Sequence, residues 1–76
     1  MASVTIRLNS IGEVKEFNRI AATVPGDVDL HSGRYCVDAK SIMGIFSLDL
    51  SKEIEMEVHS VDCADFLNDI KPFIVK

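Results

Sequence analysis

Clustered basic residues are missing from this chain, although a quarter of its residues are charged. It has 8 Lys and Arg against 12 Asp and Glu, which gives a formal net charge of −4, and the basic residues are scattered. Proteins that bind nucleic acid neutralise phosphates with grouped Lys and Arg, so the composition predicts no nucleic-acid partner. Anionic membrane surfaces attract basic segments for the same reason, so we also expect no membrane binding.

Long hydrophobic runs are missing too. The first apolar stretch, residues 4–8, is interrupted by Thr5 and Arg7, and it is too short for a signal peptide. No run approaches the length of a membrane span. We therefore expect a cytoplasmic protein, in which the two cysteines, Cys36 and Cys63, are free thiols rather than a disulfide.

Tryptophan is absent and aromatic residues make up only 7%, yet 47% of the residues are hydrophobic. A chain of 76 residues buries only about 60% of the surface that its unfolded form exposes, so it must use nearly every apolar position. We expect it to form one domain over residues 1–76 around an aliphatic core.

Two hydrophobic periodicities alternate along the chain. Strict alternation predicts strands near residues 4–8, 28–30, 35–39 and 53–59. Spacings of three and four predict helices that begin near residue 11 and near residue 62. Residues 40–48 lose the alternation, which predicts a short helix with Ser41 at its start. The order β-α-β-β-α-β-α predicts an α+β open-faced β-sandwich, a four-stranded antiparallel sheet with three helices on one face. The other face is expected to carry Arg7, Asp29, His31, Asp38, Glu55, Glu57 and His59.

Several residues mark the expected ends of these elements. Ser10 and Glu13 fit the capping box that opens a helix. Pro25, followed by glycine, is expected to end that first helix, and Pro72 is expected to kink or fray the last one near Lys71. On the third strand, Tyr35 is expected to share one face with Val37 and Ala39.

The segment 37–48 carries a family resemblance. It reads Val-Asp-Ala-Lys-Ser-Ile-Met-Gly-Ile-Phe-Ser-Leu and resembles the surroundings of the regulatory serine in HPr, the small phosphocarrier of the bacterial sugar phosphotransferase system. The similarity of residues runs from about Asp27 to Val58, and the order of elements is similar over the whole chain. The resemblance implies that a dedicated serine kinase phosphorylates Ser41 and thereby switches the protein from sugar transport to transcriptional control. It also implies a partner-binding surface for phosphotransferase-system enzymes or a transcriptional regulator, which consists of Lys40, Ile42, Met43 and Phe46.

The chain departs from the family at the phosphocarrier site. That site is a Gly-(Ile/Leu)-His-Ala-Arg-Pro segment at the start of the first helix, and its histidine takes the phosphoryl group. Here residues 9–14 read Asn-Ser-Ile-Gly-Glu-Val, and Glu13 places a negative charge where a phosphate needs a positive one. His31 is expected at the hairpin turn and His59 at the end of the last strand, both away from this helix. We therefore expect that the chain does not carry phosphohistidine.

Both implied features have a plainer interpretation. Ser41 also fits a simple helix N-cap, which stabilises a helix by about 1 kcal/mol. The residues Ile42, Met43 and Phe46 cannot all point into the core together with Ile45 and Leu48, so some of them are expected at the surface. The alternative is that two of the three are core residues.

No catalytic residue, cofactor or metal site is predicted. Cys63 follows His59 by four residues, but no third group is evident to orient a base. The side chains of His31, Cys36, His59 and Cys63 can ligate metals, but their spacing matches no known zinc pattern. The glutamates of the last strand are expected to be solvated charges.

These observations favour an HPr-like regulatory, protein-binding module rather than an enzyme. Two other functions remain open, a phosphocarrier with an atypical acceptor and a purely structural or oligomerising domain. The chain is expected to be a monomer or a weak homodimer.

Overall fold

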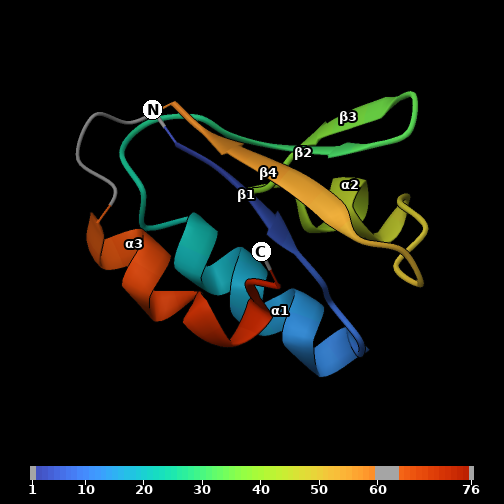
Figure 1. Cartoon of the computed structure of the whole chain (residues 1–76), viewed down its shortest axis with the longest axis horizontal. Coiled ribbons are helices and arrows are strands. Elements are labelled where there is room, and N and C mark those ends of the chain that lie inside the picture. Colours follow the sequence, from blue (N-terminus) through green and yellow to red (C-terminus); the bar gives the residue numbers. More distant parts are fainter. Residues whose placement is uncertain (1, 60–63, 76) are drawn as a thin grey trace.

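The computed structural model describes residues 2–59 and 64–75 and has the predicted order of elements (Figure 1). In chain order these are β1 (Ala2–Ile6), α1 (Ile11–Ala21), β2 (Val28–Ser32), β3 (Tyr35–Asp38), α2 (Ile42–Phe46), β4 (Ile54–Val58), α3 (Ala64–Asp69) and a short 3-10 helix, η1 (Lys71–Phe73). None of the described helices combines the length and the apolar character that crossing a membrane requires.

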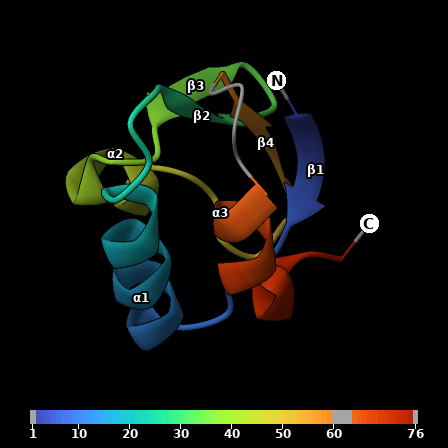
Figure 2. The same cartoon turned by 90° about the vertical axis from the view of Figure 1, so that its left-hand side faces the viewer.

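The four strands form one antiparallel sheet in the order β1-β4-β2-β3. The helices gather on one side of this sheet, as the view along the layers shows (Figure 2). The predicted α+β open-faced sandwich is confirmed. One face of the sheet is left open, and on it Asp29 lies opposite both Glu57 and Asp38.

The core lies between the sheet and the helices and is largely aliphatic, as the composition predicts. Its aromatic members join α1 to the C-terminal elements: the ring of Phe17 lies 6.4 Å from that of Phe66 and 6.1 Å from that of Phe73. Phe17 has no exposed surface. The other large side chains that are fully buried, among the residues the structure describes, are Ile6, Leu8, Leu30, Ile45, Ile54, Met56, Ile70, Val14, Val28 and Val58.

The first helix begins as predicted but ends earlier. The Glu13 amide donates to Ser10 Oγ (3.1 Å), so the predicted Ser10 cap is confirmed. Glu13 reaches back as predicted, but its Oε1 accepts from the amide of Asn9 (3.0 Å), one residue before the amide that a capping box uses. Pro25 does not end the helix, because α1 already stops at Ala21. There the chain turns so that Val24, which is 5% exposed, enters the core.

The C-terminal segment breaks where proline predicts it. The α-helix stops at Asp69, and Pro72 lies at the start of the 3-10 turn η1. Beyond it the chain runs along the outer edge of β1, where the Arg7 amide donates to the Phe73 carbonyl (2.8 Å) and the Val75 amide to that of Thr5 (2.9 Å). These bonds cover part of the sheet edge that β1 would otherwise expose.

Tyr35 lies on the predicted side of β3, but it is not part of the core. Val37 is half-buried and Ala39 is buried, as expected, but Tyr35 is 68% exposed. It lies at the hairpin end of β3, the outermost strand, so its side chain reaches solvent although it shares the side of Val37.

Gly33 forms the β2–β3 turn with a φ of 60°, a left-handed conformation that L side chains avoid. A Cβ at this position would meet no atom within 4 Å, so the cost of adding one is purely conformational. We expect Gly33→Ala to lower the free energy of unfolding by about 1–2 kcal/mol. Thermal melts should show this as a fall of at least about 4 °C in Tm.

The matched control is Gly12→Ala. Gly12 lies in α1, and its Cβ would come no closer than 3.8 Å to Ser10 Oγ. This variant is expected to gain up to about 1 kcal/mol. Equal melting temperatures for the two variants would contradict the argument.

Candidate functional site

Ser41 caps the N-terminus of α2, as the sequence predicts. Its backbone is extended, and its hydroxyl accepts a hydrogen bond from the Gly44 amide at 3.2 Å. A Cβ on Gly44 would lie 3.3 Å from both Ser41 Oγ and Val37 Cβ, so glycine allows this turn to pack closely against β3. The serine itself is exposed, which leaves its hydroxyl open to solvent on the other side.

Two side-chain hydrogen bonds hold the chain just before this cap. Asn18 Nδ2, from α1, donates to the Ala39 carbonyl at 3.1 Å, and Lys40 Nζ donates to the Val24 carbonyl at 2.6 Å. Lys40 is half-buried. Its ammonium group therefore has a structural partner, and its role in binding another protein stays a prediction.

The residues after the cap divide between surface and core. Met43 is 76% exposed and Phe46 is 38% exposed, whereas Ile45 is fully buried. Ile42 is partly buried and packs against the core. We call Met43 and Phe46 the apolar patch. The structure thus brings the exposed serine and two exposed apolar side chains together on one short helix.

The start of α1 is closed by its own side chains rather than prepared for a phosphate. The amide of Glu13 binds the Ser10 hydroxyl, and the Glu13 carboxylate is held beside it. The chain has two histidines, and neither is near. His31 pairs with Glu55 across the open face of the sheet, while α1 covers the opposite face (Figure 2).

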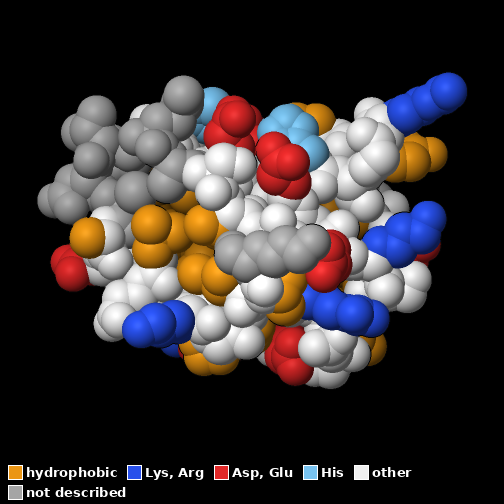
Figure 3. Space-filling view, in the orientation of Figure 1, with side chains coloured by type: hydrophobic (Ala, Val, Ile, Leu, Met, Phe, Trp, Pro, Cys, Tyr) orange, Lys and Arg blue, Asp and Glu red, His pale blue; other side chains and the backbone are white. Residues whose placement is uncertain are grey.

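His59 belongs to the same open face. Its Nε2 lies 2.9 Å from Asp29 Oδ2 and 3.1 Å from Glu57 Oε1. In the space-filling view, histidine and acidic side chains lie side by side along the upper rim, where Figure 1 shows β2 and β4 (Figure 3). The sequence places these residues on one face, but the contact depends on the register between β2 and β4, which no local pattern reveals.

A hollow of about 610 Å³ lies between the β2–β3 hairpin and the segment that joins α2 to β4. Its lining residues are Ser32, Gly33, Arg34, Tyr35, Ser47, Leu48, Asp49, Lys52 and Glu53. The pKa of Asp49 is lowered because the Ser51 hydroxyl and amide both donate to its carboxylate, at 2.6 and 3.1 Å. None of the predicted site residues lines this hollow, so it is a separate feature. Cys63, weighed in the sequence as a thiol beside His59, lies outside the described residues.

No protein-family model and no curated protein sequence matches the chain. Solved structures do resemble it. HPr-C-His from Thermoanaerobacter tengcongensis has a TM-score of 0.80 at 23% identity, covering 95% of this chain and 89% of that one. For the phosphocarrier protein HPr from Bacillus anthracis str. Ames the TM-score is 0.73 at 22% identity, covering 97% and 94%. For a histidine-containing phosphocarrier protein from Mycoplasma it is 0.71 at 17% identity, covering 93% and 86%. The chain therefore has the fold of the HPr phosphocarrier proteins.

Proposed function

We propose that this chain is an HPr-like regulatory module, a single domain over residues 1–76 that belongs with the sugar phosphotransferase system and binds proteins through α2. The observation that carries the proposal is the exposed apolar patch beside the exposed, capped Ser41. It gains weight because the surrounding fold is that of HPr phosphocarriers.

The apolar patch has the properties of a docking surface. The side chain of Met43 is 76% exposed. Exposed apolar side chains do not stabilise a small protein unless a partner covers them, so together they mark a binding surface. Methionine adapts its shape to different partners. The bonds from Asn18 and Lys40 fix the approach to α2, so the patch is presented on a rigid support and loses little entropy when it binds.

The start of α1 argues against a phosphohistidine carrier. A phosphoryl group there would meet the carboxylate of Glu13 rather than an arginine, and the amide of Glu13 already serves Ser10. Both histidines lie across the sheet from this helix. Without an imidazole at that position, the start of α1 lacks the group that takes up the labile phosphate in phosphocarriers.

Ser41 is the proposed point of regulation. A phosphoserine adds a charge of about −1.5 to −2 and three acceptor oxygens. Placed two residues before Met43, this charge would stand at the edge of the apolar patch and change which surfaces can dock there. Partners with basic groups around an apolar pocket would gain, and partners with acidic groups would lose.

Two phosphorylation reactions separate the proposal from its alternatives. Incubation with ATP and an HPr kinase, followed by intact-mass measurement, is expected to add one acid-stable phosphate to the wild type. Ser41→Ala is expected to abolish the mass shift. The matched control is Ser47→Ala, a change of an exposed serine at the other end of the same helix, and it is expected to leave the shift intact.

Incubation with phosphoenolpyruvate and the first enzyme of the phosphotransferase system is expected to add nothing. An acid-labile phosphate in this reaction would instead support a carrier with an atypical acceptor. Failure of both reactions, together with a dimer in light scattering, would support a structural or oligomerising domain.

A further inference from the structure

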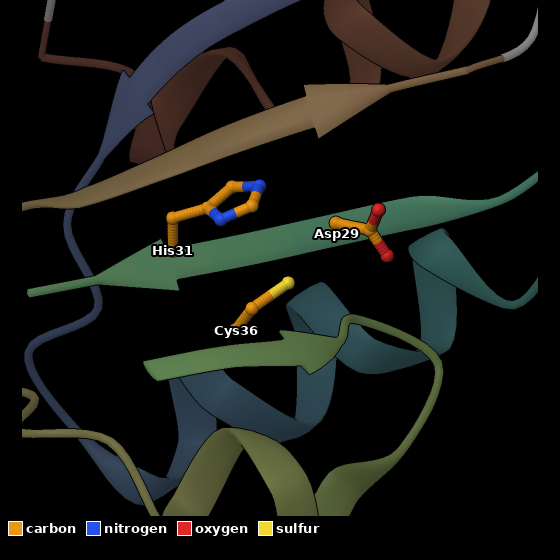
Figure 4. A group of neighbouring side chains, drawn as sticks. All are labelled: Asp29, His31 and Cys36. Atoms are coloured by element: carbon orange, nitrogen blue, oxygen red, sulfur yellow. The ribbon is translucent and has the colours of Figure 1, made fainter. Parts of the chain in front are cut away.

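The open face of the sheet assembles three different metal-binding atoms that the sequence keeps apart. Asp29 and His31 project from β2, and Cys36 projects from β3 directly opposite His31 (Figure 4). One donor atom from each, a carboxylate oxygen, an imidazole nitrogen and a thiol sulfur, lie within 4.8 Å of one another. The hairpin register makes this triad, so the spacing along the chain does not resemble a linear zinc motif.

The separation of these atoms suits a small tetrahedral ion. Zinc binds nitrogen and oxygen at about 2.0–2.2 Å and sulfur at about 2.3 Å, so its ligand atoms lie roughly 3.3–3.8 Å apart. The observed limit of 4.8 Å exceeds this by about 1 Å. Cys36 is exposed and His31 is partly exposed, so rotation of the side chains can close the gap without moving the strands.

A neighbouring histidine holds the carboxylate in place. His59 Nε2 donates to Asp29 Oδ2 at 2.9 Å, and the two side chains are 35% and 34% exposed. Metal-binding side chains are commonly fixed by a hydrogen bond of this kind from an outer residue. The bond engages one oxygen of Asp29 and leaves the second oxygen to bind an ion.

We propose that this face binds a zinc-like divalent ion through Asp29, His31 and Cys36, with His59 as a positioning residue. Nitrogen and thiolate donors select zinc and its chemical neighbours over magnesium and calcium, which prefer oxygen alone. On binding, the Cys36 thiol releases its proton to solvent and the thiolate forms the metal–sulfur bond. The fourth position is left for water or an external ligand. The site lies on the opposite side of the sheet from α1 and does not depend on the proposed regulatory function.

The test uses the untagged, reduced full chain and Co²⁺ as a spectroscopic substitute for zinc. We expect thiolate-to-cobalt charge-transfer absorption and the visible bands of tetrahedral cobalt, both saturating at one ion per chain and both lost when Zn²⁺ is added. Excess Mg²⁺ or Ca²⁺ should leave the spectrum unchanged. Cys36→Ser is expected to remove the charge-transfer absorption. His31→Ala is expected to abolish cobalt binding. Far-UV circular dichroism checks that both variants remain folded.

Two further variants make the assignment specific. Cys63→Ser is the matched control for the thiol and is expected to keep the full spectrum. His59→Ala is expected to weaken Zn²⁺ binding by about 10- to 100-fold while the thiolate absorption at saturation survives, which is the pattern of a residue that acts through Asp29.

Three results would overturn the proposal. One is the absence of thiolate absorption in the wild type, and another is its persistence in Cys36→Ser. The third is binding that ignores Cys36→Ser and His31→Ala but is lost in Glu57→Gln and His59→Ala. That result would place the ion in the adjacent group of Asp29, Glu57 and His59, whose ligand atoms also lie within 4.8 Å of one another.

Discussion

Phe17→Ala will lower the free energy of unfolding by about 3–5 kcal/mol, the range found when a buried phenylalanine is truncated. Phe17 is fully buried and its ring contacts those of Phe66 and Phe73. The truncation therefore opens a cavity between α1 on one side and both α3 and η1 on the other. At roughly 0.05–0.15 kcal/mol per residue, a chain of 76 residues has only about 4–11 kcal/mol in total. We therefore expect the variant to be partly unfolded at 25 °C.

Urea denaturation followed by far-UV circular dichroism measures this loss as a shift of the midpoint. The matched control is Ile11→Ala, a truncation on the same helix at a residue that is 64% exposed. It is expected to change stability by no more than about 0.5 kcal/mol. A loss below about 1.5 kcal/mol for Phe17→Ala would show that the three rings do not form the center of the core.

Met43→Glu combined with Phe46→Glu will slow phosphorylation of Ser41 by an HPr kinase at least about tenfold. If the apolar patch is where partners dock, it contains the residues that dominate binding, and removing such residues commonly costs more than about 1.4 kcal/mol of binding free energy. Because both side chains are exposed, 76% and 38%, the double variant is expected to keep the melting temperature of the wild type within a few degrees.

The rate is measured by intact mass over time at a kinase concentration well below saturation. Val75→Glu is the control, since Val75 is an exposed apolar residue far from α2 along the chain, 46% exposed, and the change introduces one of the two negative charges that the double variant adds. A slowed reaction in this control would point to net charge rather than to the apolar patch. An unchanged rate in the double variant would remove the patch from the docking surface.

Local chemistry could be predicted from the sequence, and contacts between distant segments could not. Both serine caps, at Ser10 and Ser41, depend on hydrogen bonds that reach three residues along the chain, and both are confirmed. The break at Pro72 is local in the same sense. The end of α1 was predicted wrongly because Val24 turns into the core before the proline is reached, and that depends on tertiary packing.

The order of the strands in the sheet also cannot be predicted from hydrophobic periodicity. Alternation gives the side of β3 on which Tyr35 lies, but not that β3 is the outermost strand and leaves this ring exposed. The same limit applies to the open face. Asp29 lies beside His59 and close to His31 and Cys36 because β2 lies between β3 and β4 in the sheet. A search for metal ligands at fixed spacings along the sequence does not find this group.

The C-terminal segment that lies along β1 has a consequence for self-association. An incoming strand at this edge would compete with the bonds that tie Thr5 and Arg7 to residues 73–75. At the other edge, no strand of the described part of the chain lies on the outer side of β3. Exposed strand edges are templates for pairing. Self-association is therefore expected at β3, where the β3 strands of two copies would pair in a symmetric dimer. Further copies could add at β1 only after residues 73–75 had been displaced from that edge.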